Sequence, residues 1–379
     1  MIGRKLSAWQ RAGLLDEQTV VAIRAYEADH ARPLALWAAI GIGALAIGLG
    51  LVSVVAANWE DIPGRLRLAV HFAALAGLAA LLWRVPRARA DDRPWMQEAA
   101  LFVFGVLGLT FFGHLGQVYQ TSAPLWQPLS LWLVLFGPVL LLRGSSWLTA
   151  ILFAGVIVWA SWGFADPVRT QFGADRRPDV VIGLTTALPV LLAPLGAWMR
   201  ERDARDGFWC RLEQLGFAYA IGCASLVAVA SGFGEMDGDG LFSFGAQMAQ
   251  VIVGLAAAAL LVGARRGRSG QALGGAVAGA ALTILLSRMI GDSQLAAGIL
   301  FMALWVGVAL AALYGGWRGV FQLAVAAVAV RLVILSFELA SDLLTSGFGL
   351  ILAGLLIFGI AWAAVRLSRR LAPERGEGA

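Results

Sequence analysis

The stretch GHLGQVYQTSAPLWQPLSLW, residues 113–132, separates two apolar runs that are each long enough to approach the thickness of a bilayer. It gathers one His, three Gln, one Tyr, two Pro and two Trp within 20 residues. A polar, proline-containing interruption between two apolar runs predicts a turn between two membrane-spanning helices. We therefore expect a chain of transmembrane helices, with this turn at one surface of the membrane.

The composition of the whole chain supports the same prediction. Of the 379 residues, 59% are hydrophobic and 14% are charged, whereas soluble domains carry about 25% charged residues. The 46 Gly suit the close packing of helices in a membrane, and many of the 15 Trp stand near the ends of apolar runs, where the headgroups lie. The sequence thus predicts an all-α, polytopic transmembrane helix bundle.

Twelve segments are candidates for crossing a bilayer, which takes about 20 apolar residues. The fourth and ninth are short, and the fourth could be tilted or partly re-entrant. The twelve candidates cover roughly residues 34–57, 66–83, 97–116, 128–142, 146–164, 180–199, 213–232, 243–264, 271–287, 294–314, 319–338 and 347–365.

The positions of the cations test this layout independently, because cytoplasmic loops are enriched in Lys and Arg. With the N-terminus inside, 22 of the 29 Lys and Arg fall on the inner side, six fall on the outer side, and Arg331 falls within a span. Both termini are therefore expected in the cytoplasm. The net charge of +5 then reflects membrane orientation, and we expect no binding of nucleic acid.

Three domains are predicted: a cytoplasmic helical segment (1–33), the transmembrane bundle (34–365) and a basic cytoplasmic tail (366–379). In the first, Gly13 should end a short helix and Asp16 should cap a second helix that ends near Asp29. This hairpin is either a collar on the inner membrane surface or a module that binds a cytoplasmic protein. No cleavable signal peptide is expected, because the first apolar run begins only at Leu34.

Three stretches together resemble a known family: AGLLDEQTVVAIRAYE (12–27), GLGLVSVVAANWEDIP (48–63) and GHLGQVYQTSAP (113–124). The chain is similar over roughly residues 5–145 to the bacterial membrane-protein family named domain of unknown function 2157. The resemblance implies a short N-terminal helical segment, many spans and a bacterial cytoplasmic membrane, but no activity. Where the family pattern often has an acid after Tyr-Gln, this chain has Ser122, Ala123 and Pro124, which puts any role of that acid in doubt.

Arg331 is the most costly residue to place in a membrane, because an Arg at mid-bilayer costs about 2.5 kcal/mol or more. Such a residue normally faces the bundle interior and has a partner. Glu338 lies seven positions later, close to the same helix face. His71, His114 and Gln117 are candidate partners by their depth. Arg331 is either an ionic or anion-binding centre or one half of a structural pair between helices.

The outer turns supply the other candidate binding residues. His114 and Gln117 are three residues apart and share a helix face, and Tyr119 follows them. Asn58, in the turn after the first span, can cap a helix or line an outward-facing pocket. The alternative for each is a structural hydrogen bond between helices or within a turn.

These residues suggest a transporter or channel-like protein for a small polar or anionic solute. The first alternative is a structural or regulatory envelope protein that acts through residues 1–33. A membrane-embedded lipid-modifying enzyme is less favoured, because the sequence has no carboxylate cluster and no nucleophile–base pair. The sequence also lacks the HExxH, CxxC, Walker-type and GxSxG motifs, and we expect no catalytic residue, metal or cofactor.

Overall fold

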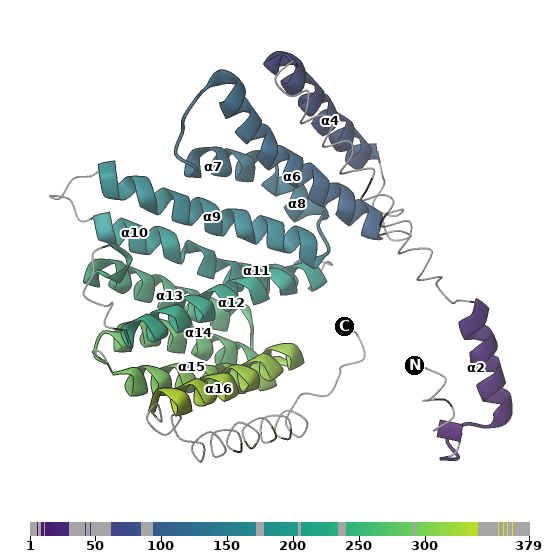
Figure 1. Cartoon of the computed structure of the whole chain (residues 1–379), viewed down its shortest axis with the longest axis vertical. Helices are drawn as coiled ribbons and strands as arrows, with labels where there is room; N and C mark the ends of the chain where they lie inside the picture. Colours follow the sequence, from purple (N-terminus) through teal and green to yellow (C-terminus); the bar gives the residue numbers. More distant parts are fainter. Residues whose placement is uncertain are drawn as a thin grey trace. The chain divides into compact units, whose positions relative to one another are not determined.

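The computed structural model describes residues 12–29, 62–84, 94–171, 178–203, 206–233, 240–290 and 293–339, with isolated positions at 6, 9, 10, 42, 46, 355, 359, 362 and 366. Its contacts divide the chain into two compact units, residues 1–67 and 68–379. In these described ranges the regular structure consists of helices and no strands (Figure 1). The predicted all-α class is therefore confirmed.

The first unit contains helix α2 (Glu17–Asp29), whose bounds agree with the predicted second helix of the N-terminal segment. Before it, the chain turns at Gly13, whose φ of +69° lies in the left-handed region that glycine adopts without strain. The Thr19 backbone N–H then donates to Asp16 Oδ1 at 3.2 Å, which is an N-cap hydrogen bond. The predicted turn and cap are thus present, and the cytoplasmic position of this segment stays a prediction.

The Asp16 cap should make the start of α2 sensitive to acid. Hydrogen bonds from the side chain and backbone of Thr19 hold the pKa of the Asp16 carboxyl below its ordinary value of 3.8. A carboxylate whose pKa is lowered by folding stabilises the folded state above its unfolded pKa, and this contribution is lost as pH falls through the lower, folded pKa. We therefore expect the protection of amides 17–20 from hydrogen exchange, corrected for intrinsic rates, to fall below pH ~4.

The matched control is Asp16→Asn, which keeps a capping oxygen but cannot titrate. Its amides 17–20 should show no such step in exchange when both proteins are followed by mass spectrometry from pH 6 to pH 3. An equal step in the two proteins would show that another group is responsible.

Nine helices in the described part of the chain are long and apolar enough to span a membrane. Eight of these spans lie in single elements, and the ninth, Asp179–Arg200, joins α10 (Pro178–Ala187), the 3₁₀ segment η1 (Leu188–Leu191) and α11 (Leu192–Arg200). The single elements are α4 (Gly64–Arg84), α6 (Pro94–Tyr119), α9 (Trp147–Gln171), α12 (Asp206–Ser231), α13 (Phe244–Ala264), α14 (Arg268–Ser287), α15 (Gln294–Gly315) and α16 (Arg318–Leu339).

A tenth candidate span is the pair α7 (Trp126–Leu135) and α8 (Gly137–Arg143), which are bent by 43° relative to each other. The bend occurs at Phe136, immediately before Gly137 and Pro138, and a proline interrupts helical hydrogen bonding. The ten candidates correspond to the second to eleventh predicted spans, which is consistent with about twelve in all. The predicted spans 34–57 and 347–365 lie outside the described residues except at isolated positions.

The second unit packs its side chains into two main apolar clusters. One is formed mainly by α6, α7, α8 and α9, and the other mainly by α12 to α16. Helices α11 and α12 contribute to both clusters and therefore connect them. Within this unit, α6 lies toward one end of the row of helices and α16 toward the other (Figure 1).

Candidate functional site

The turn that follows α6 is built from residues of the polar stretch 113–132. Gln120 has a φ of 50°, the left-handed conformation that commonly ends a helix. The Thr121 backbone N–H donates to the Gly116 carbonyl at 3.1 Å, which closes the end of α6. The chain then follows an arching loop into α7 (Figure 1).

Helix α7 is fixed against the middle of α6 by close aromatic packing. Trp132 Nε1 donates to the Gly105 carbonyl at 2.9 Å, and a Cβ atom at Gly108 would lie 2.6 Å from the ring of Phe136. The two glycines are one helical turn apart, so they form one surface on which these rings rest. The loop and the end of α6 lie beyond this contact.

A cavity of about 1050 Å³ lies between the C-terminal half of α6, the loop and α7, with Trp159 of α9 on its wall. We refer to it as the α6–α7 cavity. Its apolar wall includes Val106, Leu109, Phe112, Leu115, Leu125, Leu129, Leu131 and Trp159. Its polar wall consists of Thr110, Gln117, Gln120, Thr121, Ser122 and Gln127. A mostly apolar wall with a few polar groups is typical of small-molecule sites, and this volume is near the upper end of their range.

The polar wall of the α6–α7 cavity is uncharged over the residues that the structure describes. Gln117, Gln120 and Gln127 are exposed, so their amides can donate and accept hydrogen bonds. Thr110 is different, because its hydroxyl already bonds to the carbonyls of its own helix. This arrangement can bind a neutral solute that both donates and accepts hydrogen bonds.

His71 of α4 and His114 of α6 contact each other, and neither is among the residues that line the cavity. Their Nδ1 atoms are 3.2 Å apart, and His71 Nε2 is 2.9 Å from the Leu107 carbonyl oxygen. Thr110 and Gln117, which do line it, lie one turn before and one turn after His114 on α6. The rings of Phe111 and His71 pack in a T-shaped arrangement, with centroids 5.4 Å apart. Of the predicted polar residues, Gln117 thus lines the cavity, whereas His71 and His114 contact each other.

The geometry of the histidine pair limits the protons that it can hold. A carbonyl only accepts, so His71 Nε2 must carry a proton. In the neutral pair, His114 Nδ1–H then donates to His71 Nδ1. The contact needs at least one neutral ring, because two imidazolium rings would place two N–H groups face to face.

Two other predicted site residues that the structure describes, Tyr119 and Arg331, are not among the residues that line this cavity. Tyr119 is exposed, whereas Arg331 is buried on α16, which lies toward the other end of the row of helices from α6 (Figure 1). Leu335, one turn after Arg331, packs at Gly298, which places this face of α16 toward α15. Glu338 is in α16, but its side chain lies outside the described residues, as does the whole of Asn58.

Sequence reasoning missed two buried carboxylates. Glu98 of α6 accepts hydrogen bonds from the hydroxyls of Ser145, Ser146 and Thr149 at 2.7, 2.5 and 2.9 Å. It also accepts the Ser145 backbone N–H at 2.5 Å. These donors lie at the N-terminus of α9, where a helix favours negative charge. In the sequence, the signal for Glu98 is a single acidic residue next to a long apolar run.

Glu213 of α12 is the second missed carboxylate, and it is fully buried. It forms ion pairs with Arg200 at 2.9 Å and with Arg265 at 2.6 Å. The Arg265 guanidinium also lies 5.7 Å from the centre of the Trp317 ring. In the sequence, both arginines indicate only the predicted cytoplasmic side, because no local pattern shows that they share one acid.

Comparison with known proteins adds one finding. Residues 7–149 match the family model described as "Predicted membrane protein (DUF2157)". This confirms the resemblance noted in the sequence and supports the assignment as an integral membrane protein of unknown function. The DUF2157 match includes α2, α4, α6, α7 and α8 and ends in the first turn of α9, so it contains most of the α6–α7 cavity. No curated protein and no solved structure matches the chain.

Proposed function

We propose that the protein is a transporter or channel-like protein that takes a small, uncharged polar solute into the α6–α7 cavity. The observation that carries this proposal is the cavity of about 1050 Å³ with exposed, uncharged amides and hydroxyls on its wall. The distribution of Arg supports an extracytoplasmic position for this end of α6. A neutral solute suits this wall better than an anion, because no cation lines the cavity in the described part of the chain.

The histidine pair supports a link between solute movement and protons. Ionisable residues within membrane spans often belong to proton pathways. His114 lies on the helix that also forms one wall of the α6–α7 cavity, so a change in the His71–His114 contact would act on that wall through α6.

The test uses purified protein in liposomes, with the entry of urea, glycerol and sorbitol followed by stopped-flow light scattering. Entry of at least one solute should exceed that of protein-free vesicles. Gln117→Leu should slow it about fivefold, because one neutral hydrogen bond contributes roughly 1 kcal/mol. Gln294→Leu is the matched control, since Gln294 is also exposed at a helix end but does not line the cavity. Equal entry with and without protein would contradict the proposal.

A structural or regulatory role through the N-terminal segment is the second candidate. It is favoured by the separation of residues 1–67 as a compact unit and by the exposed apolar side chains of Trp9, Leu14 and Val21. Deletion of residues 1–30 distinguishes the two functions. Solute entry should persist in the deleted protein if the cavity carries the function.

A further inference from the structure

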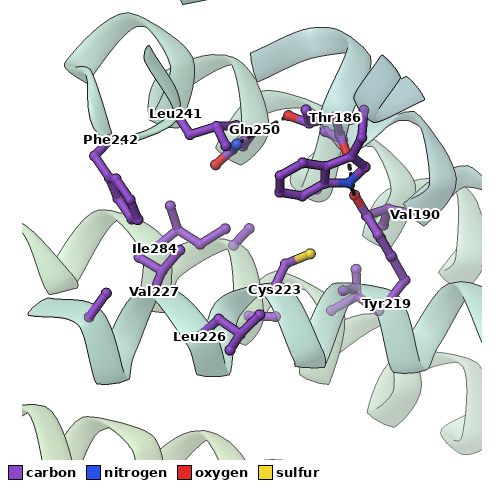
Figure 2. A pocket seen from close by; sticks show the side chains of 18 residues that line it. Thr186, Val190, Tyr219, Cys223, Leu226, Val227, Leu241, Phe242, Gln250 and Ile284 are labelled. Atoms are coloured by element: carbon purple, nitrogen blue, oxygen red, sulfur yellow. Dashed lines mark hydrogen bonds between the residues drawn. The ribbon is translucent and has the colours of Figure 1, made fainter. Parts of the chain in front are cut away.

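We propose that a second cavity, of about 330 Å³ and distinct from the α6–α7 cavity, binds an apolar molecule that carries one hydroxyl group. This α10–α12 cavity is enclosed by α9, α10, α12, α13 and α14 and by η3 (Gly240–Phe242) (Figure 2). Small residues leave the space between these helices. They are Ala187, Ala220, Ala230, Gly254, Ala280 and Ala281.

A broken helix forms one wall of this cavity. Helix α10 changes to the 3₁₀ segment η1 at Leu188, next to Pro189. In a 3₁₀ segment each N–H bonds three residues back instead of four, so the Thr186 carbonyl would pair with residue 189. Because Pro189 has no N–H, this carbonyl stays available to side chains. Tyr219 donates its hydroxyl proton to this carbonyl at 2.5 Å. Broken helices whose polar groups face a cavity are a recurrent feature of substrate sites in membrane proteins.

The hydrogen bonds at the cavity edge leave an acceptor for a ligand. Trp162 Nε1 donates to Tyr219 at 2.8 Å, and Gln250 Nε2 donates to the Thr186 hydroxyl at 3.3 Å. The Thr186 hydroxyl in turn donates to the Ile182 carbonyl at 2.7 Å. The donors of Trp162, Tyr219 and Thr186 are thus engaged.

The amide oxygen of Gln250 points into the space bounded by Phe242 and Ile284 (Figure 2). The oxygen accepts, and the amide nitrogen keeps a second N–H besides the one given to Thr186, so a ligand group that donates and also accepts, such as a hydroxyl, is complementary. Because the rest of the wall is nearly all apolar, a neutral hydroxyl fits this position better than an ammonium group, whose charge would have to be desolvated.

The ligand can enter from the lipid. Leu226 and Trp162 line the cavity and are also 72% and 42% exposed, so the cavity reaches the outer surface of the bundle. Lipid tails are as apolar as the leucines of the wall, so burial alone gives an alkane little preference for the cavity over the bilayer. Selectivity must then come from the hydrogen bond to Gln250.

Cys223 provides a direct measure of occupancy, because its thiol lies on the cavity wall (Figure 2). The chain has one other cysteine, Cys210, which lies nearer the N-terminus of the same helix, α12, and is not among the residues that line the cavity. Cys210→Ala therefore gives a protein that reports on the cavity alone. Cys223→Ala gives the matched control, which reports on the same helix outside the cavity.

The experiment measures alkylation by N-ethylmaleimide in nanodiscs, by mass spectrometry, with decane, 1-decanol or geraniol present. In the Cys210→Ala protein, an alcohol should protect Cys223 at about fivefold lower concentration than decane, as expected for one hydrogen bond in a membrane. Gln250→Leu should remove this difference. Stronger protection by 1-decanol indicates a straight-chain alcohol, and stronger protection by geraniol indicates an isoprenoid alcohol.

Three results would overturn the proposal. Equal protection by decane and both alcohols would mean that the cavity is a nonspecific void. No protection by any of them would mean that it stays empty. Equal slowing of Cys210 alkylation in the Cys223→Ala protein would place the effect outside the cavity. The comparison of alcohol with alkane needs no variant at Gln250, so it stands even if Gln250→Leu does not fold.

Discussion

Replacing Glu213 by Leu is expected to lower the free energy of unfolding by about 3 kcal/mol, because it removes the shared partner of two arginines. Both oxygens of this fully buried carboxylate are used, Oε2 by Arg200 and Oε1 by Arg265. Breaking a buried ion pair by removing one partner typically costs 3–5 kcal/mol. The lower end applies here, since the Arg200 and Arg265 side chains are 25% and 20% exposed and water screens them in part.

The control replaces all three residues: Arg200→Met, Glu213→Leu and Arg265→Met in one protein. Removing the charges together avoids buried charges without their carboxylate, so this variant should be markedly more stable than Glu213→Leu alone. Unfolding by sodium dodecyl sulfate in mixed micelles, followed by near-ultraviolet circular dichroism, gives the free energies. A triple variant with a lower free energy of unfolding than Glu213→Leu would contradict this expectation. It would show that the three side chains stabilise the fold by more than the neutralisation of one another's charges.

Much of the fold could be predicted from the sequence because apolar runs and cation positions are local signals. Ten predicted spans have counterparts among the described residues, and the short fourth span is the bent pair α7 and α8. The turn at Gly13 and the N-cap of α2 at Asp16 were also predictable, since both residues act on their own backbone neighbours. The orientation of the bundle is still a prediction from charge alone.

The candidate site was predicted only in part, because it depends on which helices touch. The polar stretch 113–132 forms much of the α6–α7 cavity, and Gln117 lines it. Depth suggested His71 and His114 as partners of Arg331, but they contact each other. The two histidines are 43 positions apart in the sequence, and no periodicity shows which residues of two neighbouring spans will meet. The α10–α12 cavity was missed for the same reason, since it combines side chains of several helices that are individually ordinary.

The close crossing of α11 and α12 is a further feature that the helical pattern could not predict. A Cβ atom at Gly216 would lie 2.3 Å from the backbone nitrogen of Ala193, and one at Gly196 would lie 2.6 Å from that of Glu213. Each glycine therefore accommodates the backbone of the other helix. This approach also allows Arg200, at the end of α11, to reach Glu213 on α12. Small residues at such crossings let membrane helices pack directly against each other.

Gly216→Ala is accordingly expected to destabilise the protein by about 3 kcal/mol, because an overpacked contact with rigid backbone can be relieved only by moving the helices apart. Gly222→Ala is the matched control on the same helix, where an added Cβ atom would meet nothing within 4 Å. That change should be neutral or should stabilise α12 by up to about 1 kcal/mol through helix propensity. The same detergent unfolding experiment compares the two, and equal stabilities would mean that α11 and α12 do not cross at Gly216.

Because the crossing also brings Arg200 to Glu213, Gly216→Ala and Glu213→Leu should couple, and their combined cost should be smaller than the sum of the separate costs.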